Sequence, residues 1–235
     1  MNNINQVVIL AGGKGTRMRE MTEDLPKPMV RVGDIPVLEH LINIFERHAK
    51  FKFIVCTGYL ENIIFDYFSK WENVEVISTG DDTNTGGRLF KVRDLLDENF
   101  LVTYGDGLAN VDITKLIEFH NSHQKIGTIT VTRPISRFGL VDFNKKFEVT
   151  KFIEKPMLEG YVNMGFMVFK KQFINYLNSY STLETEPLIQ LTNYNELNAF
   201  VHKGYFEPMD TYREFLNMNR LWNEGKAPWD TNFKK

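Results

Sequence analysis

The chain has 235 residues, 43% of them hydrophobic and 25% charged, the balance of a globular domain with room for a substantial core. Its formal net charge of −2 gives no overall field for nucleic acid or anionic lipid, so an anion site must be a local cluster of cations. The single cysteine, Cys56, excludes an intrachain disulfide, and its apolar surroundings predict a buried side chain. We find neither a signal-peptide pattern nor an apolar run approaching the ~20 residues that span a bilayer, so we expect a cytoplasmic protein.

The first predicted element is a buried strand at residues 7–10, which leads directly into a glycine-rich loop. Its glycines permit positive φ and leave room for close approach of a phosphate to backbone amides: Gly12, Gly13 and Gly15. Three cations follow at the same end of the strand: Lys14, Arg17 and Lys27. This combination predicts a polyphosphate site. The alternative is a glycine turn that only reverses the chain.

The loop differs from the two commonest phosphate loops. A Walker loop needs Ser or Thr directly after its Gly-Lys pair, and here Gly15 follows Lys14. A dinucleotide fingerprint closes on a small residue, and here Met18 stands at that position.

Apolar runs alternate with amphipathic segments through the first half, an order typical of a parallel sheet with helices on both faces. The predicted strands lie at residues 7–10, 51–56, 74–77 and 100–104. The predicted helices lie at residues 37–45, 59–71 and 88–96, with another starting at Asp112, a good N-cap. Ligands of such sheets bind beyond the carboxyl ends of the strands.

The second half changes character and includes strands with antiparallel, hairpin-like spacing. Strands are predicted at residues 127–133, 139–143, 147–153 and 161–170, and helices at 172–178 and 211–222. We predict one α/β domain over residues 1–235, with a Rossmann-like, mostly parallel mixed sheet and a small antiparallel β part. The later strands are expected to wall one side of the cleft.

Two aspartates are candidate metal ligands. Asp106 follows the strand at 100–104, at the sheet edge that carries the glycine loop, and glycines flank it on both sides. Asp210 precedes the terminal helix, where an N-cap is an equally good interpretation. Two carboxylates opposite a basic phosphate loop suit Mg²⁺, which takes one or two carboxylates plus substrate phosphates.

Three further segments carry polar groups toward the same cleft. Lys155, after Glu154, could reach a second phosphate, although a solvated ion pair at a turn is the simpler interpretation. Asn163 interrupts an apolar strand and needs hydrogen-bonding partners that a ligand could supply. Residues 85–88 form a second glycine turn, interpreted either as a base-reading loop or as a helix start with an exposed Arg88.

Together these segments resemble the sugar-1-phosphate nucleotidylyltransferase family, and most closely its glucose-1-phosphate cytidylyltransferases. The resemblance spans nearly the whole chain in the family's order. It rests on Ala11-Gly12-Gly13-Lys14-Gly15-Thr16-Arg17, Pro26-Lys27-Pro28-Met29, Thr85-Gly86-Gly87-Arg88, Gly105-Asp106-Gly107, Arg137-Phe138-Gly139, Glu154-Lys155-Pro156, Met209-Asp210-Thr211 and Lys226-Ala227-Pro228-Trp229. It implies the fold of nucleotide-diphospho-sugar transferases, with a nucleotide-binding half at 1–125 and a sugar-phosphate-binding half at 126–235.

The resemblance also implies a reaction, in which a nucleoside triphosphate and a sugar-1-phosphate give a nucleotide sugar and pyrophosphate. Arg17 would steady the pyrophosphate, Lys27 would neutralise the attacked α-phosphate, and Asp106 and Asp210 would hold Mg²⁺. The implied nucleotide-binding residues are Leu10, Ala11, Gly12, Gly13, Gly15, Thr16, Thr85, Gly86, Arg88, Tyr104 and Gly105. The implied acceptor-binding residues are Gly139, Glu154, Lys155 and Asn163.

Several alternatives remain open from the sequence. The family commonly has Asn-Gly-Gly where this chain has Asn163-Met164-Gly165, so Met164 either fills part of the sugar pocket or points into the core. The stretch between Trp71 and Thr79 is also shorter than in the glucose enzymes. The substrate pair is CTP with glucose-1-phosphate by default, or UTP, dTTP, GTP or another acceptor phosphate. A catalytically idle nucleotide-binding regulatory module is the alternative of another class. We expect a homo-oligomer, with neither nucleic acid nor membrane as partner.

Overall fold

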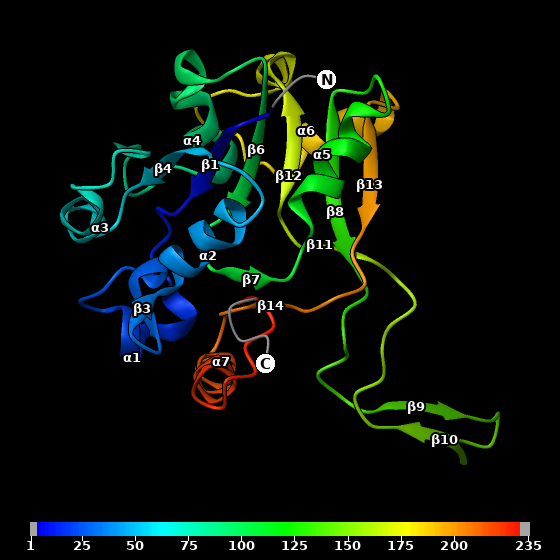
Figure 1. The fold of residues 1–235 in the computed structure, drawn as a ribbon. Coiled ribbons are helices and arrows are strands. Elements are labelled where there is room, and N and C mark those ends of the chain that lie inside the picture. Colours follow the sequence, from blue (N-terminus) through cyan, green and yellow to red (C-terminus); the bar gives the residue numbers. More distant parts are fainter. Residues whose placement is uncertain (1–3, 231–235) are drawn as a thin grey trace.

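The computed structural model describes residues 4–230, built around one eight-stranded mixed sheet (Figure 1). Four parallel strands form its first half, with β1 between β6 and β4, and β5 at the edge. Their bounds are β1 Gln6–Leu10, β4 Lys52–Thr57, β5 Val74–Ser78 and β6 Asn99–Tyr104. The predicted parallel sheet is confirmed.

Helices cover both faces of the sheet, because side chains alternate along each buried strand. Along β1, Val7 and Ile9 belong to one hydrophobic core, whereas Val8 and Leu10 belong to the other. The first core packs α2 (Val37–Glu46), α3 (Glu61–Phe68), α5 (Ile113–Asn121) and α7 (Tyr212–Asn223). The second packs α4 (Thr85–Lys91), the 3₁₀ helix η4 (Lys171–Tyr176) and α6 (Glu186–Asn193). Cys56 is buried in the second core, as predicted.

The second half extends the sheet with antiparallel pairings. β12 (Met167–Lys170) runs antiparallel to both β6 and β8 (Gly127–Thr132), and β13 (Leu197–Val201) lies parallel on the other side of β8. The single strand predicted at 161–170 is wrong. It is two strands, β11 (Val162–Asn163) and β12, because Gly165 and Phe166 both have positive φ between them.

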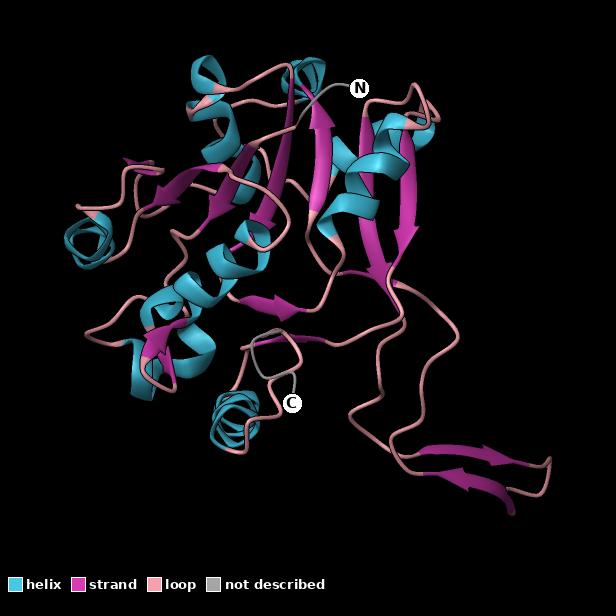
Figure 2. Ribbon diagram, viewed as in Figure 1, coloured by secondary structure: helices cyan, strands magenta, loops and turns pink. Residues whose placement is uncertain are grey.

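Three small two-stranded sheets complete the fold (Figure 2). One pairs β2 (Arg31–Val32) with β3 (Ile35–Pro36), and another pairs β7 (Gly107–Ala109) with β14 (Phe206–Pro208). The third, β9 (Leu140–Phe143) with β10 (Val149–Ile153), projects away from the body of the protein. The expectation that the later strands wall the cleft therefore holds for β11 but is wrong for this hairpin.

Several predicted helices have other bounds or another form. The helix predicted at residues 59–71 is the shorter helix α3. It starts after Leu60, because Leu60 has a positive φ. The helix predicted at 88–96 starts earlier, as α4, and continues as the 3₁₀ helix η3 (Arg93–Leu95). The helix predicted at 172–178 is the 3₁₀ helix η4. Asp112 caps α5, as predicted, and accepts a hydrogen bond from the Lys115 amide. Among residues 4–230, no helix combines the length and apolarity needed to cross a bilayer.

Candidate active site

A cavity of about 940 Å³ opens at the carboxyl ends of β1 and β6, the edge where open α/β sheets bind ligands. The glycine loop after β1 and the residues after β6 both line it. The predicted site residues that line it are Leu10, Ala11, Gly12, Gly13, Gly15, Thr16, Arg17, Lys27, Thr85, Arg88, Tyr104, Gly105, Asp106, Asn163 and Asp210. The topology therefore gathers most of the predicted residues at one place.

Backbone geometry holds the glycine loop against the sheet edge. The Ala11 amide donates to the Cys56 carbonyl at 2.9 Å, which extends the pairing of β1 with β4 into the loop. Gly15 has φ of 61°, a left-handed conformation that glycine adopts without strain. The loop then enters the 3₁₀ helix η1 (Thr16–Met18) and the short helix α1 (Arg19–Thr22). This path leaves the amides near Gly13 beside the cavity.

Arg88 holds this loop in place through hydrogen bonds, and its side chain is buried, with only 3% exposed. Its guanidinium donates to the carbonyls of Gly12 and Thr57, at 2.9 and 2.7 Å, and to the Thr79 hydroxyl at 2.6 Å. A Cβ at Gly12 would fall 2.0 Å from that guanidinium, so a larger residue there would displace Arg88 from these hydrogen bonds. The alternative of an exposed Arg88 at a helix start is therefore wrong, because the side chain is buried. Arg88 lines the cavity, and its guanidinium bonds to the loop and to the ends of two strands.

The centre of the cavity is a cluster of charges around Lys27, at the start of the 3₁₀ helix η2 (Lys27–Met29). The Lys27 ammonium donates to Asp106 Oδ2 at 2.5 Å and to Asp210 Oδ1 at 2.9 Å. The Arg17 guanidinium donates to the other Asp210 oxygen at 2.8 Å. Pairing of β7 with β14 brings the two aspartates together, and the Met209 amide donates to the Asp106 carbonyl. Asp210 is therefore a member of this charge cluster, and the N-cap of α7 is Thr211, without a side-chain cap hydrogen bond.

The protonation states follow from this geometry. Burial opposes the charged form of Lys27, but the adjacent Asp106 and Asp210 outweigh it and raise the pKa of the ammonium above its usual value. Burial likewise opposes ionisation of Asp210, but Lys27, Arg17 and Arg137 lower the pKa of that carboxyl below its usual value. Lys27 and Asp210 are thus both charged at neutral pH.

The Lys27 ammonium pairs with both Asp106 and Asp210. The same two carboxylates offer oxygen ligands to Mg²⁺. Carboxylate oxygens are the ligands Mg²⁺ prefers, and one or two of them suffice when phosphates supply the rest. Among residues 4–230, no group of three or more His, Cys, Asp or Glu side chains forms a metal site. Asp106 and Asp210 therefore fit Mg²⁺ that arrives with a nucleotide, and they fit a dedicated all-protein metal cage poorly.

The far end of the cavity carries a carboxylate that the sequence did not reveal. Glu184 accepts hydrogen bonds from the Thr85 hydroxyl at 2.8 Å and from the Tyr104 hydroxyl at 2.5 Å. No motif singles it out, because its partners lie 80 or more positions away. Gly86 does not line the cavity: a Cβ there would meet Ser181 at 2.8 Å, so this glycine serves packing of α4.

The residues predicted to bind the acceptor lie in two places. Asn163 lines the main cavity, and its carboxamide oxygen accepts from the Gly165 amide. Gly139, Glu154 and Lys155 do not line it. Lys155 instead borders a second cavity of about 1220 Å³, with Arg137 and Arg213. The two cavities are neighbours, since Val162 and Pro208 line the second one while Asn163 and Asp210 line the first.

The structure also decides the position of Met164, which the sequence left open. Its side chain is 3% exposed and belongs to the core beneath the sheet. The tight turn at Gly165, whose φ is 79°, carries the chain back to the Tyr104 side of the cavity. Met164 therefore points into the core and does not line the main cavity.

A family model described as nucleotidyl transferase matches residues 6–211, so the chain belongs to the nucleotidyl transferase family. Within that family it is 40% identical over 255 residues to the glucose-1-phosphate cytidylyltransferase of Salmonella typhimurium, covering 96% of this chain and 99% of the relative. It is 34% identical over 251 residues to a probable glucose-1-phosphate cytidylyltransferase of Bacillus subtilis, covering 95% and 98%. The predicted family is confirmed.

Among solved structures, the fold is similar to that of HddC from Yersinia pseudotuberculosis. The TM-score is 0.74 at 27% identity, over 93% of this chain and 100% of HddC. Another structure of HddC is a complex with GMP-PN. The predicted fold class is confirmed by this likeness and by the sheet described above.

Proposed function

We propose that this protein transfers a cytidylyl group from CTP to a sugar-1-phosphate, giving a CDP-sugar and pyrophosphate, with glucose-1-phosphate as the default acceptor. One observation carries the proposal: a largely buried lysine, Lys27, pairs with two aspartates in the cavity that the glycine loop lines. Two anions must meet in this reaction, and a fixed cation at their meeting point lowers the barrier through positioning and charge stabilisation. The 40% identity to a relative of that name supports the choice of nucleotide and acceptor.

In the proposed reaction, the loop amides near Gly13 bind the triphosphate and Arg17 holds the departing pyrophosphate. An oxygen of the acceptor phosphate forms the new bond to the α-phosphorus, and the bond between the α-phosphorus and the bridging oxygen breaks. The acceptor is already ionised, so no general base is needed. Lys27 contacts the α-phosphate, on which negative charge concentrates. Asp106 and Asp210 would hold Mg²⁺, which when bound screens the phosphate charges.

The base is proposed to lie beside Thr85 and Glu184, at the end of the cavity that these two hydrogen-bonded side chains line. A carboxylate accepts a hydrogen bond from the N4 amino group of cytosine, whereas the O4 of uracil would be repelled there. Arg88 supports this contact only indirectly, through the loop. GTP is the second candidate nucleotide, because HddC, a structural relative, is known in complex with GMP-PN.

The acceptor is proposed to extend from Asn163 toward the second cavity, where Lys155 would anchor its phosphate. Glu154 and Gly139, on the same ribbon, would contact its hydroxyls. The halves 1–125 and 126–235 would thus serve nucleotide and acceptor within one domain. We further propose a cytoplasmic homo-oligomer that uses neither nucleic acid nor a membrane.

A substrate panel tests this proposal. Purified protein is assayed for pyrophosphate release with CTP, UTP, dTTP and GTP, each paired with several sugar-1-phosphates. Release with CTP and a sugar phosphate is the expected result. Release with another nucleotide alone would move the assignment to that transferase, and binding of nucleotide without release from any pair would favour the idle regulatory module.

A further inference from the structure

The hydroxyl of Tyr104 connects side chains that are proposed to bind different substrates. It donates a hydrogen bond to Glu184 Oε1 at 2.5 Å, while Glu184 Oε2 accepts from the Thr85 hydroxyl at 2.8 Å. A second hydrogen bond joins the same Tyr104 hydroxyl to the side chain of Asn163. The carboxamide oxygen of Asn163 accepts from the Gly165 amide at 3.1 Å, which leaves its nitrogen to donate to Tyr104. One hydroxyl therefore links the proposed base contact with a proposed acceptor contact.

The chemistry of these groups fixes the direction of each hydrogen bond. A carboxylate only accepts, so the hydroxyls of Tyr104 and Thr85 both donate to Glu184. The Thr85 oxygen accepts in turn from the Leu183 amide at 2.9 Å. Burial and the adjacent Glu184 raise the pKa of Tyr104, and the bond from Asn163 opposes them, as expected of a donor to the phenol oxygen. Tyr104 therefore keeps its proton at neutral pH, and donation runs from Asn163 through Tyr104 to Glu184.

Glu184 depends on these bonds for its position. It is an exposed residue, so packing does not hold its side chain. Tyr104, by contrast, is the last residue of β6 and pairs with Leu10 of β1. Its ring lies against the turn after Asn163, where a Cβ on Gly165 would fall 2.9 Å from the ring. The sheet thus holds Tyr104, and Tyr104 holds Glu184. A polar group selects its partner sharply only when its own orientation is fixed.

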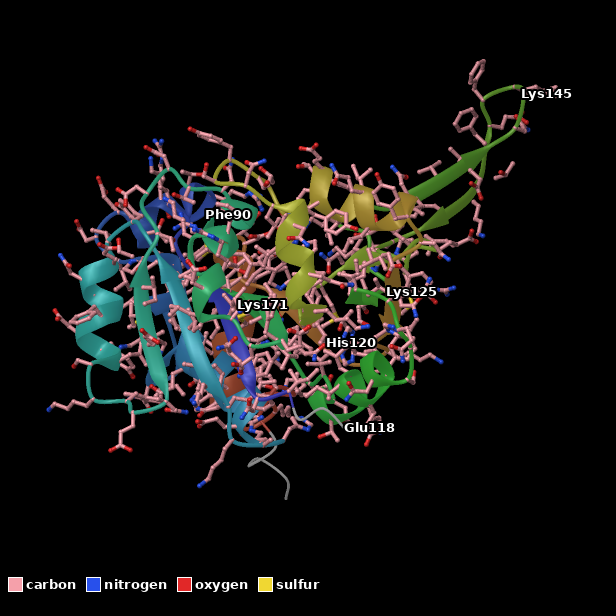
Figure 3. All side chains as sticks on the ribbon, turned by 90° about the horizontal axis from the view of Figure 1, so that it is seen from above. Phe90, Glu118, His120, Lys125, Lys145 and Lys171 are labelled. Carbon is pink, nitrogen blue, oxygen red and sulfur yellow. The ribbon has the colours of Figure 1, made fainter. Side chains whose placement is uncertain are left out.

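Asn163 is the predicted acceptor contact that belongs to the main sheet. It lies in β11 and pairs with Val131 of β8. Glu154 and Lys155 instead follow β10 on the projecting hairpin, whose outer end at Lys145 is well clear of the sheet and helices (Figure 3). An acceptor hydroxyl bound to Asn163 therefore contacts the same hydrogen-bonded chain that ends at Glu184.

We propose that Tyr104 is a positioning residue that couples binding of the acceptor to recognition of the nucleotide base. The inference rests on the proposed function, because it takes Asn163 as an acceptor contact and Glu184 as a base contact. Immobilising side chains costs conformational entropy. The first substrate orders the side chains of Asn163, Tyr104 and Glu184, so the second substrate finds them ordered and binds more tightly. By linkage, each substrate raises the affinity for the other by the same factor.

Isothermal titration calorimetry measures this coupling without turnover. The probe is the α,β-methylene analogue of CTP with Mg²⁺, in which carbon replaces the bridging oxygen that must leave. The coupling factor is the ratio of its Kd without and with saturating glucose-1-phosphate. Both substrates are anions and repel each other equally in any variant, so the comparison between proteins isolates the hydroxyl. The factor is expected to be at least about fivefold larger in wild type than in Tyr104→Phe, and equal factors would overturn the proposal.

A matched control separates this role from a structural one. The Tyr67 hydroxyl also donates to a glutamate, Glu39, at 2.5 Å, but Tyr67 lines neither cavity. Tyr67→Phe should therefore keep the wild-type coupling factor, whatever its effect on Tm. Loss of coupling in Tyr67→Phe as large as in Tyr104→Phe would overturn the assignment to Tyr104.

A measurement on wild type alone keeps the test decisive should Tyr104→Phe fold poorly. The α,β-methylene analogue of UTP carries O4 where cytosine carries an amino group, so it offers no donor to Glu184. Its coupling factor with glucose-1-phosphate should be severalfold smaller than that of the CTP analogue, and equal factors would overturn the proposal. Absence of turnover in wild type with every substrate pair would refute the proposed function, whereas the coupling factors alone decide the role of Tyr104.

Discussion

Replacing Lys27 with methionine removes the cation between Asp106 and Asp210 and keeps the length of the side chain. The lysine side chain is 13% exposed, and those of the aspartates are 27% and 24% exposed. Breaking a fully buried pair costs about 3–5 kcal/mol. Partial exposure, and the Arg17 contact that Asp210 retains, reduce this to about 2 kcal/mol. For a chain of this length that corresponds to a Tm lower by roughly 4–8 °C.

The loss should depend on pH in a defined way. The lowered pKa of Asp210 in the folded state means that its contribution is complete above its unfolded pKa, about 3.9, and is lost as pH falls through the lower folded value. The raised pKa of Lys27 means that its contribution is complete below about 10.4 and is lost as pH rises through the folded value. The Tm difference between wild type and Lys27→Met should thus be a plateau near neutrality that shrinks at both extremes.

Differential scanning calorimetry from pH 3 to 11 measures this plateau, and Lys14→Met is the control. Lys14 lines the same cavity but pairs with exposed Asp82, so its Tm should stay at the wild-type value. Mg²⁺ without nucleotide should raise the Tm of Lys27→Met more than that of wild type, because the ammonium no longer competes for the carboxylates. Equal Tm values for wild type and Lys27→Met at pH 7 would refute this account of the charge cluster.

Four further outcomes follow from the site. Asp106→Asn should lower kcat about 10²–10³-fold in a pyrophosphate-release assay and leave the far-ultraviolet circular dichroism unchanged; normal turnover would remove Asp106 from the reaction centre. Arg88→Ala should cost about 2–4 kcal/mol in urea unfolding, because buried carbonyls lose their donor. The comparison variant Arg93→Ala loses only one hydrogen bond to the Phe90 carbonyl and a contact with that ring, so it should cost less than Arg88→Ala. Met164→Gly should destabilise the fold by more than about 2 kcal/mol, because truncating a buried side chain typically costs ~2–5 kcal/mol. The KM for the acceptor should stay unchanged. A changed KM would show that Met164 lines the acceptor pocket. Glu184→Gln should reduce the preference for CTP over UTP, measured as the ratio of their kcat/KM values, by about tenfold. An unchanged ratio would show that Glu184 does not select the base.

The parallel half of the fold was predictable because its signals are local. Continuous apolar runs such as residues 7–10 mark strands buried on both faces, and helical spacing at 37–45 marks the helix between two of them. The strand ends then place the glycine loop and Asp106 at one edge by topology alone. The sequence motifs also predicted that Lys27, Asp106 and Asp210 belong to one site. Only the structure shows how Asp210 reaches it, through the pairing of β14 with β7.

What the sequence could not predict depends on contacts between distant positions. Arg88 is buried because acceptors 31 and 76 positions away surround it, and no local pattern separates it from an exposed helix-start arginine. Glu184 joins the site through equally distant partners. The outward direction of the β9–β10 hairpin depends on ladder bonds at its root, whereas strand propensity fixes only that it is a hairpin.

The most direct test of the central claim is product formation by the purified protein and by one active-site variant. Incubation with CTP, glucose-1-phosphate and Mg²⁺ should give CDP-glucose and pyrophosphate in equal amounts, detected by chromatography and mass spectrometry. Asp210→Asn should form both products at least a hundredfold more slowly, in the range expected when charge stabilisation is lost, ~10²–10³. Absence of any nucleotide sugar from wild type with every nucleotide and sugar phosphate, or full activity in Asp210→Asn, would contradict the account.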